Sequence, residues 1–346
     1  MKKLFTITTI VTTALTMSLG NVALAATFSD GELLFDQPGW DYSPSSMLDA
    51  DGKEKVWWCG HLDGHDVIKY RERLQNGPWS APQIVLQSDR FQAGQAPLPW
   101  EGVHTCDPTV TRGTWDYLGQ IYTYILYYTT ERPSTTGIDN RIGVAFSKDG
   151  IVWKKHTTPV INDGNTGTYG TGQSVAWSAS AGAGVRTIYT FVDSAGGIKY
   201  YYRESADGIN FGERRELSQA GLTLNGVPGI SHASPAVGFA PGIYQNHYYY
   251  HLVSVCETHN DSPNGPAWGT AKAVCVYRAE GDNAFTGTWA RVLDSTHVKP
   301  VEVEPSFRTN LYGAVDELPT ITVNHGCSGS GQPSTWEICW YKGSVP

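Results

Sequence analysis

A repeat of about 64 residues constrains this chain more than any other feature, because a regular period predicts similar units arranged around or along an axis. Each copy joins a short strand that starts near a proline or polar residue to a second strand rich in aromatic residues. The first strands are 64 residues apart between Pro44 and Pro108, 65 between Pro108 and Gln173, and 62 between Gln173 and Pro235. A fifth copy starts at Pro319, 84 residues further on, which predicts an insertion near residues 295–315.

The second half of the copies carries a hairpin signal. Phe146–Trp153 and Glu204–Phe211 share the sequence Ser-x-Asp-Gly, and Asp-Gly is typical of tight β-hairpins. The fifth copy stops after two strands, near residues 341–343, and a matching segment stands at Phe28–Phe35. A ring closed by both chain ends leaves no open sheet edge. We therefore predict an all-β fold, a five-bladed β-propeller with four-stranded blades whose last blade is closed by the N-terminal strands. Five in-phase copies disfavour the rival fold, a pair of β-sandwiches.

The first 25 residues have the pattern of a secretory signal peptide. Lys2 and Lys3 precede an apolar stretch over residues 4–19, and Ala23-Leu24-Ala25 is a small-x-small cleavage site. A membrane anchor is disfavoured, because the apolar run is shorter than the ~20 residues a span needs. We predict that residues 1–25 are removed and that residues 26–346 form a single propeller domain, exported to the periplasm or secreted, with no membrane insertion.

Composition excludes several classes of protein. The chain is 40% hydrophobic and 12% aromatic, which supports a large core and argues against disorder. Its net charge is −8, and it becomes −10 once the two lysines of the signal peptide are lost. No cluster of Lys or Arg is present, so we expect no nucleic-acid partner. We expect a monomer.

Six cysteines in an exported protein predict disulfides. Cys256 and Cys275 flank one loop, Cys327 and Cys339 flank another, and the remaining two are left to pair, although six cysteines allow 15 connectivities. No CxxC spacing of the kind found in zinc sites is present, so we expect no metal at the cysteines.

The repeat also predicts where a functional site would lie. The first strand of each propeller blade lines the central channel, so residues at the starts of these strands should share one funnel. The ends of the aromatic strands should lie at the same rim. The candidates are Trp40, Asp41, Tyr42, His61, Asp63, His104, Cys106, Asp107, Thr171, Gln173, Asp193, Ser231, His232, Glu257, Asp316 and Glu317.

Three motifs resemble those of a known family. The blade count, Ser43-Pro-Ser, Asp107-Pro-Thr-Val and the hairpin that ends at Trp153 are similar to the five-bladed glycoside hydrolase propellers of the arabinanase and β-xylosidase group, which are related to the invertase and fructanase propellers. The resemblance covers nearly all of the mature chain. It implies three acidic groups from different blades in the funnel, and Asp41 and Asp107 match two of their positions. Gln173 stands where the third, a glutamate, is expected.

A substitute acid would then have to be Glu257, Glu317 or a histidine such as His232. The two carboxylates of such an enzyme lie across the scissile bond, and one of them holds a proton near neutral pH. We therefore take Asp41, Asp107, Glu257 and Glu317 as the candidate catalytic residues. The candidate substrate-binding residues are Trp40, Trp100, His104, Trp177 and His232.

Each candidate also has a purely structural reading. Asp before Pro often starts a strand, most Trp and Tyr of a propeller pack in its core, and a histidine often forms only local hydrogen bonds. The Asp-Gly aspartates Asp30, Asp149 and Asp207 are predicted to be turn residues. His61, Asp63, His65 and Asp66 could form a metal cluster, but their Gly-containing spacing favours a solvated loop.

The sequence therefore predicts a carbohydrate-active propeller, a glycosidase that hydrolyses a polysaccharide or oligosaccharide. The first alternative is a non-catalytic, lectin-like glycan-binding propeller, and the second is a sialidase-like hydrolase, which would need an Arg cluster. We expect no cofactor beyond the structural calcium ion that the resembled family often carries on its axis. No Asp-x-Asp-x-Asp-Gly loop supports that ion here.

Overall fold

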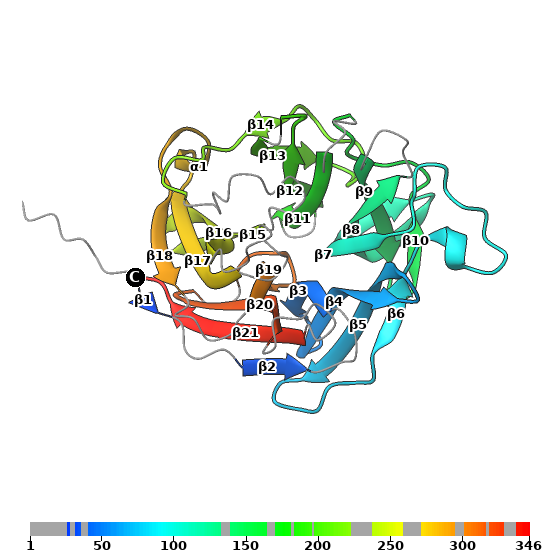
Figure 1. Ribbon diagram of the computed structural model, residues 1–346, viewed down its shortest axis with the longest axis horizontal. Helices are drawn as coiled ribbons and strands as arrows, with labels where there is room; N and C mark the ends of the chain where they lie inside the picture. The colour runs from blue at the N-terminus through cyan, green and yellow to red at the C-terminus, as the bar shows by residue number, and fades with distance from the viewer. Residues whose placement is uncertain are drawn as a thin grey trace, which may run out of the picture.

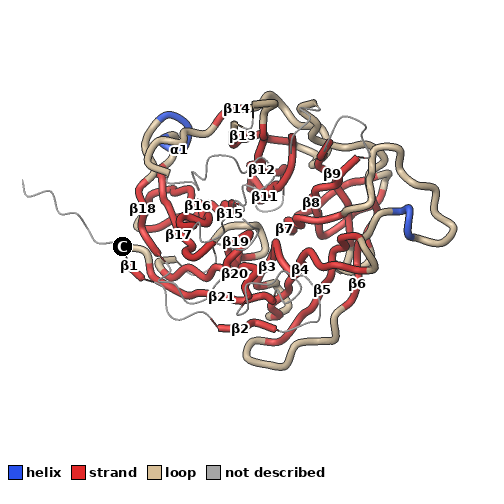
Figure 2. The backbone as a smooth tube through the Cα atoms, viewed as in Figure 1, coloured by secondary structure: helices blue, strands red, loops and turns tan. Residues whose placement is uncertain are grey.

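The computed structural model describes residues 26–27, 32–35, 41–132, 139–164, 170–180, 183–195, 197–222, 237–258, 271–294, 301–315, 318–328 and 337–346. This part of the chain consists almost wholly of β-strands and loops (Figure 2). Its only helical segments are η1 (Asp89–Phe91) and α1 (Asn283–Thr286). No helix in the described residues is long and apolar enough to cross a membrane. The all-β prediction is confirmed.

Strand pairing groups the described strands into antiparallel runs of four. Each run starts with a strand near the centre of the molecule and ends with one toward the outside (Figure 1). The first two runs are β3 (Asp41–Leu48), β4 (Lys53–Leu62), β5 (His65–Leu74) and β6 (Gln83–Leu86), and then β7 (Thr105–Tyr117), β8 (Gln120–Arg132), β9 (Asp139–Ser147) and β10 (Trp153–Lys155).

The next two runs repeat this order. They are β11 (Gly170–Ser180), β12 (Ala183–Val192), β13 (Ile198–Ser205) and β14 (Arg215–Glu216), and then β15 (Val237–Tyr244), β16 (His247–Thr258), β17 (Ala271–Glu280) and β18 (Ala290–Asp294). The short β1 (Ala26–Thr27) pairs in parallel with β18.

The last run combines both ends of the chain. It is β19 (Val301–Asn310), β20 (Thr320–Ser328), β21 (Glu337–Ser344) and β2 (Glu32–Phe35). The N-terminal strand therefore pairs with the C-terminal one, as the sequence predicts. The prediction that the first strand of this copy starts near Pro319 is wrong. Its first strand is β19, which also pairs in parallel with β3. The stretch taken as an insertion contains that strand.

Aromatic residues of the second strands fill the space between neighbouring runs, which explains the aromatic-rich sequence. Trp57 of β4 packs against Tyr124 of β8, with ring centroids 6.4 Å apart. Its indole N–H donates to the Gly150 carbonyl, 2.8 Å away, in the hairpin after β9. In the same way the Tyr127 hydroxyl donates to the Gly208 carbonyl at 2.8 Å in the hairpin after β13. These two Asp-Gly hairpins are thus hydrogen-bonded to the run before them.

The turn aspartates behave as predicted. The Asp149 carboxylate accepts hydrogen bonds from the backbone N–H groups of Ile151 and Val152, each 2.9 Å away. Asp207 makes the equivalent contacts in its hairpin. Asp30 lies outside the described residues.

Two predicted disulfides, Cys59–Cys106 and Cys327–Cys339, are confirmed. Cys275 is also disulfide-bonded. The side chain of Cys256, its predicted partner, lies outside the described part.

Candidate functional site

Four residues near the starts of the central strands share an unusual backbone. Ser43, Asp107, Gln173 and Glu304 have φ angles of 48°, 50°, 44° and 48°. They come from β3, β7, β11 and β19, and each stands at or within a shift in the register between its strand and the next. Such φ values are uncommon outside glycine, and strained residues and bulges concentrate at functional sites. The repeat therefore places a strained residue at the same point of four runs.

The side chains of these four residues meet. Ser43 Oγ lies 2.7 Å from Asp107 Oδ1 and also hydrogen-bonds Glu304 Oε2. The Gln173 amide donates to Glu304 Oε1 at 3.2 Å. Asp107, Gln173 and Glu304 are 6–9% exposed. Residues from four runs, up to 261 positions apart in sequence, thus form one buried polar cluster.

The Ser43 hydroxyl bridges the two carboxyl groups and so fixes their spacing. Two O–H···O hydrogen bonds in sequence place the bridged oxygens within about 5.5 Å of each other. Asp107 and Glu304 therefore lie close enough to act on the same substrate bond.

The x-Pro-Ser/Thr sequence explains why these strands converge. The hydroxyl two residues after the strained position contacts the backbone of a neighbouring central strand. Ser45 Oγ accepts from the Val110 N–H, and Thr109 Oγ1 accepts from the Ala176 N–H, each at 3.1 Å. Ser306 Oγ donates to the Pro44 carbonyl. These bonds hold the central strands side by side and keep the cluster in place.

A second polar group lies beside the cluster, anchored on Asp66 at the start of β5. His104 Nδ1 is 2.7 Å from Asp66 Oδ2, and His61 Nδ1 is 3.4 Å from Asp66 Oδ1. The Tyr42 hydroxyl also bonds to Asp66. Burial raises the pKa of Tyr42 far above its ordinary value, and the negative charges of Asp66, Glu304 and Asp107 raise it further. The phenol therefore stays protonated between both groups.

Asp66 also lies beside the Cys59–Cys106 disulfide, which joins β4 to β7. A carboxylate oxygen of Asp66 lies within 4.8 Å of the sulfurs of Cys59 and Cys106, and Cys106 directly precedes Asp107. Burial works to raise the pKa of Asp66, but the hydrogen bonds with His104, Tyr42 and His61 and the charge of His104 together outweigh it, so the pKa lies below its ordinary value.

Asp41, a predicted catalytic residue, has different contacts. It is fully buried, and its carboxylate accepts from Trp58 Nε1 at 2.8 Å and from Lys69 Nζ at 3.2 Å. Burial raises its pKa, and the positive charge of Lys69 offsets this in part. The Lys69 side chain reaches Asp41 across Gly60, where a Cβ atom would lie 2.6 Å from Nζ. The contacts of Asp41 are therefore with its own sheet, β3 to β5, rather than with Asp107.

The predicted sugar-stacking tryptophans need correction. Trp100 is 6% exposed and donates from Nε1 to the Thr157 carbonyl, and Trp177 is 2% exposed and packs on Tyr202 and Tyr250. Neither indole offers an open face to a sugar, because both fill the core between runs. His104, in contrast, is partly exposed and pairs with Asp66. Trp40, His232 and Glu317 lie outside the described residues, and Glu257 belongs to β16 with a side chain outside them.

Glu304 was not among the candidates. Its sequence, Glu304-Pro305-Ser306, matches Ser43-Pro44-Ser45 and Asp107-Pro108-Thr109. That match could have identified it, but the fifth copy was aligned on Pro319 instead.

No described group of side chains fits a metal ion. The sets of three metal-ligating residues that come close together each include both sulfurs of a disulfide, which are not thiolates.

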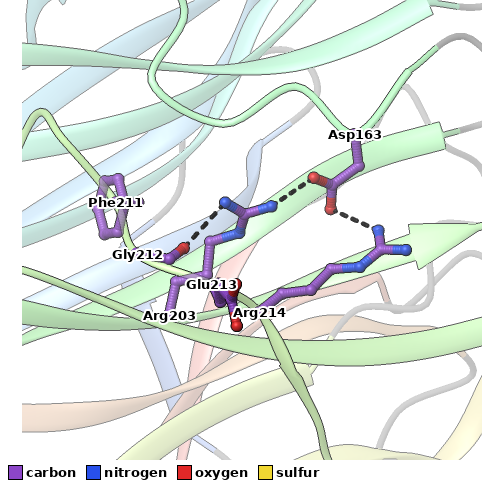
Figure 3. A pocket seen from close by; sticks show the side chains of 6 residues that line it. All are labelled: Asp163, Arg203, Phe211, Gly212, Glu213 and Arg214. Atoms are coloured by element: carbon purple, nitrogen blue, oxygen red, sulfur yellow. Dashed lines mark hydrogen bonds and ion pairs between the residues drawn. The ribbon is translucent and has the colours of Figure 1, made fainter.

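A separate shallow hollow of about 780 Å³ lies at β13 and the segment after it, lined by Asp163, Arg203, Phe211, Gly212, Glu213 and Arg214 (Figure 3). The Asp163 carboxylate lies between two guanidinium groups, 2.6 Å from Arg203 and 3.1 Å from Arg214. These contacts tie the segment before β11 to the outer strands, so we read the hollow as structural.

No protein-family model and no curated protein matches the chain. Solved structures match over most of its length. One named as a glycoside hydrolase is 11% identical, with a TM-score of 0.58 over 92% of each chain. The catalytic domain of a GH62 α-L-arabinofuranosidase from Coprinopsis cinerea is 12% identical, with a TM-score of 0.57 over 92% of this chain and 97% of that one.

Zg3597, a family 117 glycoside hydrolase from the marine bacterium Zobellia galactanivorans, is 10% identical, with a TM-score of 0.56 over 92% of this chain and 90% of that one. The chain has the fold of the β-propeller glycoside hydrolases. At identities this low, the structural matches establish the shared fold alone. The reaction has to be argued from the site.

Proposed function

We propose that this protein is an exported glycoside hydrolase that cleaves a polysaccharide or oligosaccharide at the Asp107–Glu304 pair. One observation carries the proposal. Two carboxyl groups from distant strands meet on strained backbone at the starts of the central strands, bridged by Ser43. Five runs of four strands support a propeller of five blades, with β19 beside β3 at the join. Disulfides support export.

The pair suits the chemistry of glycosidic cleavage. As the bond to the leaving group breaks, positive charge develops at the anomeric carbon, and a nearby carboxylate stabilises that charge or bonds to the carbon. A serine hydroxyl donates only one hydrogen bond, so we further propose that Asp107 and Glu304 share one proton through Ser43 and carry a single negative charge. Burial keeps the field of this charge strong, because little water screens it. We assign the pair to the anomeric side of the bond.

The test is turnover on a panel of aryl glycosides and polysaccharides, which also identifies the sugar. Asp107→Asn and Glu304→Gln should each lower kcat/KM by at least about 100-fold. Asp116→Asn is the matched control, because Asp116 is exposed at the far end of the same strand. Undiminished turnover in both site variants would overturn the proposal. Glycan binding without turnover by the unaltered protein would favour the lectin-like alternative.

A further inference from the structure

We propose that His104, oriented by Asp66, is the proton donor for the leaving group of this reaction. The proposal rests on the proposed function and adds a catalytic residue to it. A glycosidase needs a proton for the departing oxygen, and the donor must stand across the scissile bond from the nucleophile or base.

The shared proton of the carboxyl pair is poorly placed for this task. It is held in the Ser43 bridge, and the serine oxygen fills the space between Asp107 and Glu304. A glycosidic bond cannot enter that space while the bridge is intact. Both carboxyl residues are also less than 10% exposed. The pair therefore acts from one side of the bond, and the donor comes from another residue.

His104 has the geometry of an oriented acid. Two groups approach its Nδ1, Asp66 Oδ2 at 2.7 Å and the Asp66 backbone N–H at 3.3 Å. The shorter contact is to a carboxylate, so Nδ1 carries a hydrogen and donates to Asp66. This leaves Nε2 as the ring nitrogen that exchanges protons, as in other carboxylate–histidine pairs. The His104 side chain is 37% exposed, so solvent and substrate reach the ring.

The surroundings favour the charged form of the ring. The charged groups near it are Asp66 from β5 and Glu131 from β8, and Asp66 also meets Tyr42 from β3 and His61 from β4. The hydrogen bond with Asp66 raises the pKa of His104 above its ordinary value. Tyr42 hydrogen-bonds Asp66 and lies within electrostatic reach of Asp107 and Glu304, so it connects the Asp66–His104 pair with the carboxyl pair.

The proton balance is closed by water. The imidazolium gives its Nε2 proton to the glycosidic oxygen as the carbon–oxygen bond breaks, and the sugar leaves as an alcohol. A water molecule then adds its hydroxyl to the anomeric carbon, and its remaining proton returns to the protein. No other reactant is needed.

The experiment compares good and poor leaving groups. His104→Asn should lower kcat by about 10²- to 10⁴-fold on an oligosaccharide, the range of general acid catalysis. On a dinitrophenyl glycoside, whose leaving group needs no proton, the loss should be less than about 10-fold. The matched control is His247→Asn, since His247 Nδ1 lies 2.6 Å from Glu280 in a similar pair on the β16–β17 strands. That variant should behave like the unaltered protein.

Asp66→Asn tests the same idea with the ring retained. The acid must be protonated, so activity falls as pH rises through the pKa of His104. Loss of the Asp66 charge lowers that pKa, and the alkaline limb of the kcat/KM profile should move to lower pH. Equal losses on both leaving groups, or an unmoved alkaline limb, would overturn the assignment of His104. If instead Asp107→Asn and Glu304→Gln keep full turnover, the proposed function itself fails.

Discussion

The two ends of β3 carry polar clusters that differ in how their charges are held. At one end, Ser43 and Gln173, both neutral, bond to Asp107 and Glu304. At the other, Asp49 meets two cations, Lys55 from β4 and Arg112 from β7, and the Tyr124 hydroxyl. Both clusters join the first two runs of strands. A carboxylate balanced by cations is suited to hold the fold, whereas carboxyl groups whose hydrogen-bond partners are neutral keep a charge that can act on a substrate.

Asp49→Asn should show the largest effect on stability. Lys55 is 6% exposed and Asp49 1%, so the substitution removes the buried carboxylate of a buried cation and leaves it the partly exposed Asp51, 3.1 Å away. Removal of one partner of a buried pair costs about 3–5 kcal/mol. We expect a loss of about 3 kcal/mol in urea unfolding, with turnover of the folded enzyme retained. Asp51→Asn, at a residue 44% exposed beside the same lysine, is the control. Equal, small losses of stability in both variants would mean that the Asp49 cluster contributes little to the free energy of unfolding.

Ser43→Gly should change stability little and lower activity strongly. Glycine accepts the φ of 48°, so the backbone is kept while the hydroxyl bridge is lost. We expect a stability change within about 1 kcal/mol, the contribution of an ordinary hydrogen bond. Without the bridge the carboxyl pair loses its shared proton, so kcat should fall by about 10-fold or more. Thermal unfolding measures the stability change, and steady-state kinetics measures the loss of kcat. A stability loss as large as that of Asp49→Asn would contradict the difference between the two clusters.

Low pH should weaken the Asp49 cluster. Burial works to raise the pKa of Asp49, but hydrogen bonds from Lys55 and Tyr124 outweigh it, and the pKa in the folded protein lies below the ordinary value. Its contribution to stability is therefore complete above the unfolded-state pKa of about 3.9 and is lost as pH falls toward the folded-state value. The transition temperature of Asp49→Asn should depend less on pH between about 5 and 2 than that of the unaltered protein. Parallel curves would contradict this.

Asp207→Asn should have the smallest effect. Burial acts to raise the pKa of Asp207, but hydrogen bonds from the Asn210 and Ile209 backbone lower it to about 2. The side chain is exposed at its hairpin, so solvent screens its charge and the loss should stay below about 1 kcal/mol. Chemical denaturation measures it. A loss larger than that of Asp49→Asn would show that this hairpin turn stabilises the fold more than the Asp49 cluster does.

The repeat predicts the fold well because turns and strands leave local signals. The Asp-Gly hairpins and the pairing of Glu32–Phe35 with β21 follow from it. The side chains are harder to predict, because a β-bulge changes which way a strand's side chains point. Ser43 lies in such an irregularity two residues after Asp41, so Ser43 joins the carboxyl pair while Asp41 bonds within its own sheet.

The tryptophans illustrate a second limit. The sequence identifies aromatic residues near strand starts, but it does not distinguish a residue that packs between runs from one that faces an opening. Trp177 is of the first kind, because it is 2% exposed. Glu304 shows that a repeat aligned on the wrong proline hides a residue whose local motif is clear.

The central claim is that Glu304 and Asp107 form one catalytic unit. The most direct measurement is kcat/KM of Glu304→Gln, Asp107→Asn and the double variant on the best substrate of the glycoside panel, with unfolding temperatures recorded alongside. The effects of substitutions on kcat/KM are not additive at residues that act as one unit. The account predicts that each single variant loses at least about 100-fold and that the double variant loses little more, with the fold intact. Full turnover by either folded single variant would contradict it.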